Sequence, residues 1–200
     1  MERSVLKSNA KNQLRGKWFT AVVSFLLAGI IASIFSGLSN LVDSDLLKIV
    51  LELLTVLVSG AIAYGLCTLS LNFANNNDAQ ISDIFAGFNS KVYLKSLCLC
   101  ILIGIVVTIG FILLIIPGII LSLMYSQAFF ILCEDNDKSV IQCMKESSEL
   151  MKGHKWEFFV LGLSFILWII LGIITCGIAM LWVTPYMNVT YANFYKSLVS

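Results

Sequence analysis

Two long uncharged segments constrain the fold of this chain more than any other feature of its sequence. Residues 96–133 and residues 158–195 each run for 38 positions without a charged side chain. As a single α-helix, such a segment would be roughly 57 Å long, at about 1.5 Å per residue. The hydrocarbon core of a bilayer is about 30 Å thick, and about 20 residues cross it. Each segment therefore predicts two membrane crossings joined by a tight turn.

The composition supports an all-α, polytopic membrane protein. Only 12% of the 200 residues are charged and 58% are hydrophobic, whereas a soluble domain carries about 25% charged residues. The six cysteines show no C-x-x-C spacing. They are therefore expected to be small core residues rather than a disulfide framework or a zinc site.

The apolar segments and their breaks predict six transmembrane helices arranged as three hairpins. Pro117 is suited to the first turn of a helix, because a proline in a helix interior would remove a hydrogen bond. A cleaved signal peptide is the alternative for the first apolar segment, although that segment is longer than a usual signal sequence. The predicted helices lie at residues 18–35, 53–74, 96–115, 117–133, 158–175 and 177–195, within a membrane domain of residues 18–196.

Two short amphipathic helices are predicted to lie in the membrane interface, after the second and the fourth transmembrane helix. The first has apolar residues at helical spacing from Ile81 to Phe88. The second begins at Ser139, which has capping-box spacing to Gln142, and ends near Gly153. One apolar face beside a polar face is the pattern of a helix that lies on a membrane.

The basic residues predict the orientation. With six crossings and a cytoplasmic N-terminus, 12 of the 13 lysines and arginines lie inside, and only Lys48 lies outside. If residues 96–133 crossed once, the division would be 8 inside and 5 outside. The positive-inside rule therefore favours six crossings with both termini in the cytoplasm.

Residues 1–17 are predicted to form a basic, amphipathic cytoplasmic segment. Four basic residues recur at every fourth position, with three apolar residues beside them. Such a helix is expected to contact anionic lipids, gaining about 1 kcal/mol per basic residue. A simple orientation signal is the alternative, and both can hold. The basic residues are Arg3, Lys7, Lys11 and Arg15, and the apolar ones are Leu6, Ala10 and Leu14.

The ionisable residues give no sign of catalysis. No charged residue or histidine falls near the middle of a predicted helix, which argues against a proton relay. Glu52 lies at the edge of its helix near Lys48, and His154 has no neighbours spaced to complete a metal site. The cluster Glu134-Asp135-Asn136-Asp137 lacks the spacing of a calcium loop. We therefore expect no catalytic residue, cofactor, metal or nucleic-acid partner, and no enzyme.

Uncharged polar residues in the second, fourth and sixth helices predict a polar seam, here meaning a shared polar surface between the even-numbered helices. Three of its tyrosines are spaced by 61 residues, which indicates internal repetition or coincidence. The alternative to a shared seam is separate interhelical hydrogen bonds, worth about 0.6 kcal/mol each. The residues are Asn72, Gln127, Asn188, Asn193, Tyr64, Tyr125 and Tyr186.

Several segments together resemble the domain of unknown function 975 family, over nearly the whole chain. The resemblance implies an integral membrane protein of bacteria, and it carries over no catalytic residue. The segments are Leu14–Trp18, Asp83–Phe88, Ile115–Ile120 followed by Tyr125, Ser147–Trp156, Leu163–Phe165, Pro185-Tyr186 and Phe194-Tyr195.

We therefore expect a non-catalytic protein of the bacterial cell membrane that contacts lipids, another membrane protein or a second copy of itself. Envelope stress, secretion and toxin immunity are roles of this type. The alternative is a small permease component that uses the polar seam, and solute flux distinguishes the two. A membrane enzyme is disfavoured, because no acid, base or nucleophile set converges in the sequence.

Overall fold

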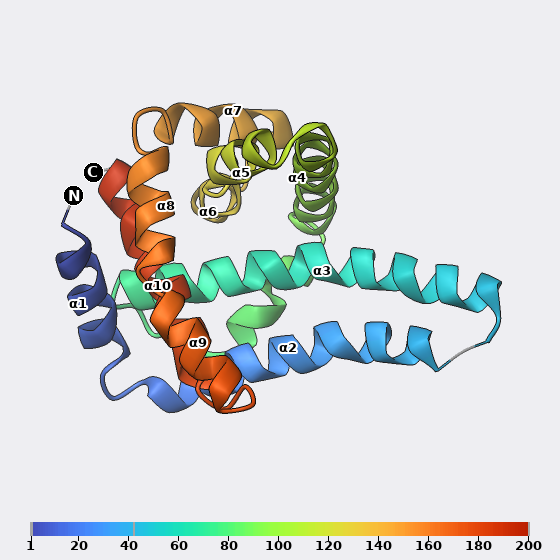
Figure 1. Ribbon diagram of the computed structural model, residues 1–200, viewed down its shortest axis with the longest axis horizontal. Coiled ribbons are helices and arrows are strands. Elements are labelled where there is room, and N and C mark those ends of the chain that lie inside the picture. The colour runs from blue at the N-terminus through green and yellow to red at the C-terminus, as the bar shows by residue number, and fades with distance from the viewer. Residues whose placement is uncertain (1, 42, 200) are drawn as a thin grey trace.

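The protein is all-helical over the residues that its structure describes (Figure 1). The structure is a computed structural model that describes residues 2–41 and 43–199, without the side chains at positions 35, 36, 39 and 40. In chain order the helices are α1 (Arg3–Leu14), α2 (Trp18–Asn40), α3 (Asp45–Ala74), the 3-10 helix η1 (Ile81–Phe88), α4 (Tyr93–Leu113), α5 (Ile115–Met124), α6 (Ala128–Glu134), α7 (Val140–Leu150), α8 (Lys155–Leu163), α9 (Ile166–Ile174) and α10 (Met180–Val199).

Four described helical segments are long and apolar enough to cross a membrane. They are Asp45–Ala74, Tyr93–Leu113, Ile115–Glu134 and Lys155–Ile174. A fifth arises if α1 and the first part of α2, which meet at a bend of 98°, count as one span. α10 is not among them, and its sequence is interrupted by polar residues such as Asn188 and Lys196. The prediction of an all-helical chain with several helices that could cross a membrane is therefore confirmed, whereas six crossings are not.

Local signals in the sequence place several helix ends. The side chain of Ser139 accepts a hydrogen bond from the backbone N–H of Gln142, and the side chain of Gln142 accepts one from the N–H of Ser139, as capping-box spacing predicts. Gly153 follows α7 with a φ of 89°, a conformation that glycine adopts without strain. Pro117 lies in the first turn of α5, as expected. α3 begins at Asp45, earlier than the predicted residue 53.

The short helix predicted after the second crossing is present, but it is packed against the protein. Ile84 of η1 is buried with Ala28 of α2 and Ile62 of α3. A side chain at Gly65 would lie 1.9 Å from the backbone oxygen of Ile84, so α3 and η1 meet backbone to backbone. The amphipathic pattern therefore buries Ile84 in protein, whereas Phe85 and Phe88 remain exposed.

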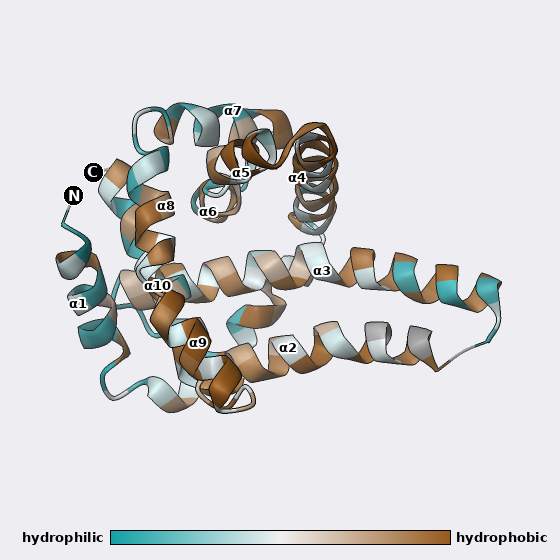
Figure 2. Ribbon diagram, in the orientation of Figure 1, coloured by the Kyte–Doolittle hydropathy of each residue, from teal (hydrophilic) through white to brown (hydrophobic). Residues whose placement is uncertain are grey.

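α3 is the central helix, and it contacts α2, η1, α4, α6 and α10. Figure 1 shows α3 running across the view, whereas α4 is seen nearly along its axis. α10 packs more extensively on α1 and α3 than on α9. Three similar hairpins are therefore not confirmed. Figure 2 shows the strongest apolar colour on α4, α5 and α9, and much of α1 and α7 in polar colours.

Candidate functional site

The apolar stripe of α1 packs on the protein. Leu6, Ala10 and Leu14 are buried, and Ala10 and Leu14 join a cluster that includes Phe25 of α2 and Phe73 of α3. The expected position of this helix on a lipid leaflet therefore needs a correction. Its apolar face is covered by protein because α10 and α3 supply a matching apolar surface, and only its polar face remains free for lipids.

The four basic residues of α1 divide into two groups. The ammonium of Lys7 donates to the backbone oxygen of Ser164 at 3.0 Å and lies 4.1 Å from the centre of the Phe165 ring. Burial, together with the nearby charge of Arg3, lowers the pKa of Lys7 below its usual value. Lys7 thus binds the connection between α8 and α9.

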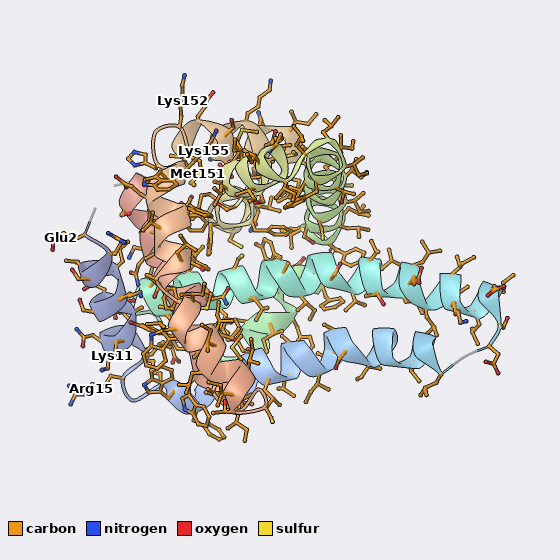
Figure 3. The ribbon with its side chains drawn as sticks, in the orientation of Figure 1. Glu2, Lys11, Arg15, Met151, Lys152 and Lys155 are labelled. Atoms are coloured by element: carbon orange, nitrogen blue, oxygen red, sulfur yellow. The ribbon has the colours of Figure 1, made fainter. Side chains whose placement is uncertain are left out.

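The other three basic residues, Arg3, Lys11 and Arg15, are exposed. Figure 3 shows Lys11 and Arg15 near the C-terminal end of α1, with Arg15 pointing away from the molecule. These residues can meet an anionic surface without losing a contact within the protein. Lipid contact at this helix stays a prediction.

A pair of amides joins the two ends of the chain, and sequence analysis did not identify it. The Gln13 amide donates to Asn193 Oδ1 at 3.1 Å, and the Asn193 amide donates to Gln13 Oε1 at 2.7 Å. Gln13 and Lys196 also both donate to the backbone oxygen of Ala74, each at 2.9 Å. The sequence contains one sign of this pair, because Gln13 is a polar residue on the apolar face of α1.

The polar-seam residues of α3 each bind a different neighbour. The Tyr64 hydroxyl donates to Asn136 Oδ1 at 2.6 Å, in the connection before α7. The Asn72 amide donates to Asp83 of η1 at 2.9 Å. Asp83 also accepts from the backbone N–H of Gln80, so its carboxylate fixes the start of η1 against α3. These contacts tie α3 to the segments around it.

The remaining polar-seam residues likewise bind different neighbours and not one another. Gln127 is buried, its amide donates to Ser126 at 2.9 Å, and its Oε1 has no hydrogen-bond partner among the described residues. Asn188 donates to the Thr184 oxygen of its own helix, and Tyr186 packs edge-on against Phe165. Tyr125 ends α5 and is half-buried.

None of the seven seam side chains hydrogen-bonds to another across the described part of the chain. The arrangement thus resembles separate interhelical contacts more than a shared path.

A cavity of about 910 Å³ lies beside Tyr64, between η1, the start of α4 and the connection before α7. Lys91 and Lys95 line it together with Phe85 and Phe88. The Lys95 ammonium donates to the backbone oxygen of Asn136. This lysine therefore holds two of the walls together, whereas Lys91 is exposed.

Several ionisable residues outside α1 bind another ionisable side chain. His154 lies 3.2 Å from Glu157, and the Tyr195 hydroxyl donates to Glu134 at 2.7 Å. The hydrogen bond from Lys138 to Glu146 raises the pKa of that lysine. Within residues 2–41 and 43–199, no three His, Cys, Asp or Glu side chains are grouped to hold a metal ion.

A comparison with known families matches this chain along its whole length. The model described as Protein of unknown function (DUF975) matches residues 1–117 and residues 105–200. No curated protein and no solved structure matches the chain.

Proposed function

We propose that this chain, which belongs to the protein family of unknown function DUF975, has a non-catalytic role in the bacterial cell membrane, where it binds lipids or a partner protein. Its long apolar helices indicate a membrane location. The lipid-binding or partner-binding role goes further and is our proposal.

The exposed apolar side chains of these helices carry the proposal. Ile112 at the end of α4, Leu167 in α9 and Ile173 in α9 have 78%, 75% and 74% of their surfaces exposed. Soluble monomers rarely leave large contiguous apolar patches uncovered. Lipid chains or the apolar face of another membrane protein would cover these side chains without any change in the fold.

The polar contacts support a role without catalysis. Catalytic sites gather ionisable groups with perturbed pKa values in a cleft. Here several side chains of α1, α3 and α10 bind distant backbone oxygens and amides, as Lys7 and Gln13 do, and others bind their own helix. Such contacts hold segments together and leave few groups for a reaction.

We further propose six crossings with both termini in the cytoplasm, because this arrangement places 12 of 13 basic residues inside. Cys176 provides a direct test. It is exposed, and it lies in the turn between α9 and α10. Six crossings would bring this turn to the outer surface of the membrane.

The experiment retains Cys176 as the only cysteine and treats intact cells with a membrane-impermeant maleimide. Matched variants without native cysteines carry Asp43→Cys as an outside reference or Lys138→Cys as an inside reference. We expect Cys176 and position 43 to be labelled, and position 138 only after the cells are opened. Labelling of position 43 without Cys176 would mean that α9 and α10 do not traverse the membrane.

The partner is approached by crosslinking within the membrane. A photo-reactive residue replaces Ile116, which is 71% exposed, or Leu99, which is fully buried, as the matched control. Crosslinks to lipid or to one protein from position 116 alone support the proposal. A role in envelope stress, secretion or toxin immunity stays a prediction until such a partner is identified.

A further inference from the structure

A small pocket brings together three of the four tryptophans of this chain. Its volume is about 190 Å³, and its walls come from α1, α2, α9 and α10. Its lining residues are Lys11, Trp18, Trp168, Trp182, Val183 and Tyr186. The fourth tryptophan, Trp156, lies at the start of α8 and lines a different cavity.

The polar groups of this pocket are almost entirely hydrogen-bond donors. An indole N–H can only donate, and a lysine ammonium carries three donors and no acceptor. Across the described residues, the ammonium of Lys11, the three indole N–H groups and the hydroxyl of Tyr186 make no hydrogen bond within the protein. The pocket therefore presents free donors and one positive charge between aromatic walls.

We propose that this pocket binds the phosphodiester head group of an anionic membrane lipid. A phosphodiester is an anion that only accepts hydrogen bonds, so it complements both the donors and the charge of Lys11. Tryptophan and tyrosine commonly lie at the head-group level of a membrane, with their apolar rings against lipid. The aromatic walls can contact the glycerol and the first part of the acyl chains.

The fold holds Lys11 in place for this purpose. Its neighbour Ala10 is buried, and Gln13, two positions further, is bound to Asn193 and Ala74. Lys11 is therefore presented from a helix that is fixed on α10, which also supplies Trp182. An aromatic cage for a quaternary ammonium is the competing chemistry, and the positive charge of Lys11 opposes it.

This inference deepens the proposed function, because it rests on the membrane location. It does not rest on six crossings, which would place Lys11 in the cytoplasm and Trp182 only six residues from an outer turn at Cys176. The labelling of Cys176 therefore distinguishes the two arrangements, because labelling from outside the cell would contradict the pocket. The test uses the full chain in a neutral detergent, with Trp156→Phe so that every remaining tryptophan lines the pocket. Tryptophan fluorescence is followed during titration with dioctanoyl phosphatidylglycerol. Parallel titrations use dioctanoyl phosphatidylcholine, free glycerol phosphate and tetramethylammonium.

We expect a saturable fluorescence change with phosphatidylglycerol alone. Lys11→Gln should weaken binding by about tenfold, as expected for the loss of one charge-assisted hydrogen bond, and Lys11→Arg should largely retain it. The matched control is Lys152→Gln, which removes one exposed charge at the far end of the molecule (Figure 3). It should leave the affinity within about twofold, since distant exposed charges are screened.

Four outcomes would overturn the proposal. Equal binding of both lipids would show that the head-group charge is not recognised, and equal binding of glycerol phosphate would assign the pocket to a soluble ligand. Saturable binding of tetramethylammonium alone would identify a cation cage. Equal losses in Lys11→Gln and Lys152→Gln would indicate only general electrostatic attraction.

Retention in membranes after alkaline extraction separates this inference from the proposed function. A chain that stays in the membrane but does not bind phosphatidylglycerol contradicts only the pocket assignment. A chain that is released contradicts the membrane proposal itself.

Discussion

Two regions of the molecule differ in whether polar side chains bind distant segments. The packed body consists of α1, η1, residues 60–74 of α3, α6 and α10. Several of its side chains bind segments far away in sequence, as Gln13 does with Asn193. The outer ends are residues 45–58 of α3, residues 101–122 of α4 and α5, and the turn at residues 173–178. Their large apolar side chains are mostly exposed.

Polar side chains in and near the outer ends bind their own helix. Thr55 donates to the oxygen of Leu51, and Ser122 donates to the oxygen of Ile119. Polar groups in hydrocarbon must be satisfied within the protein, because lipid chains offer no partners. This difference between the two regions indicates that the outer ends are suited to lipid, whereas specific long-range contacts stabilise the packed body.

The largest expected difference between the two regions concerns glycine. Gly65→Ala places a Cβ 1.9 Å from the oxygen of Ile84, so α3 and η1 must separate. We expect a loss of about 3 kcal/mol in the free energy of unfolding, the usual range for overpacking. Gly104→Ala in α4 meets no atom within 4 Å and should stabilise the helix by up to about 1 kcal/mol. Thermal unfolding in detergent measures the stability of both variants. Similar changes in stability for Gly65→Ala and Gly104→Ala would contradict the distinction between the packed body and the outer ends.

The amide pair of the body should show the next largest effect. Asn193→Leu leaves the Gln13 amide without one partner, and we expect a loss of about 2 kcal/mol. A double-mutant cycle with Gln13→Leu should give a coupling energy of about 1 kcal/mol or more. Ser122→Ala, which removes only a bond within one helix, should stay within about 0.5 kcal/mol. A coupling energy near zero would show that the bond between Gln13 and Asn193 does not stabilise the packed body.

Two asparagines of the packed body separate a bond to another segment from a bond within one helix. Asn72→Leu breaks the bond to Asp83 and should cost about 1 kcal/mol. Asn188→Leu loses only a bond to its own helix, and its cost should be no more than about 0.6 kcal/mol. Neither variant should reduce solute flux in proteoliposomes. Robust flux by the parent protein, abolished by a variant that still folds, would favour the permease instead.

The smallest expected effect is on the pH dependence of the free energy of unfolding. It compares Lys7 of the packed body with Lys138, which lies in the exposed connection before α7. The folded-state pKa of Lys7 is lowered by burial, so the unfolded chain binds more protons just below the ordinary value of 10.5. The contribution of Lys7 to the free energy of unfolding should therefore rise as the pH increases through that window.

Lys138 should behave in the opposite way. Its folded-state pKa is raised by the hydrogen bond to Glu146, so its stabilisation is complete below 10.5 and is lost as the pH rises through the raised pKa. Lys7→Met and Lys138→Met, compared with the parent in unfolding experiments between pH 8 and 11, should change the pH slope in opposite directions. Equal slopes in all three proteins would show that neither lysine titrates differently on folding.

Much of the secondary structure was predictable from sequence because it depends on neighbouring residues. The capping box at Ser139 and the position of Pro117 are confirmed within single helical turns. The turn of α8 into α9 at Ser164 was not predicted, since an uninterrupted apolar segment carries no local sign of a break. The basic stripe of α1 was visible, but not the attachment of Lys7 to Ser164.

The sequence by itself determined an all-helical chain with long apolar helices, because helical hydrogen bonds and the absence of charge are local properties. Only the tertiary structure decided which helices meet. It paired Gln13 with Asn193, 180 positions apart, and brought Trp18, Trp168 and Trp182 to one pocket. The physical reason is that helices apolar on nearly every side do not mark the face that packs on protein, since lipid and protein interior are similarly apolar. Close glycine contacts and a few polar pairs then select the arrangement.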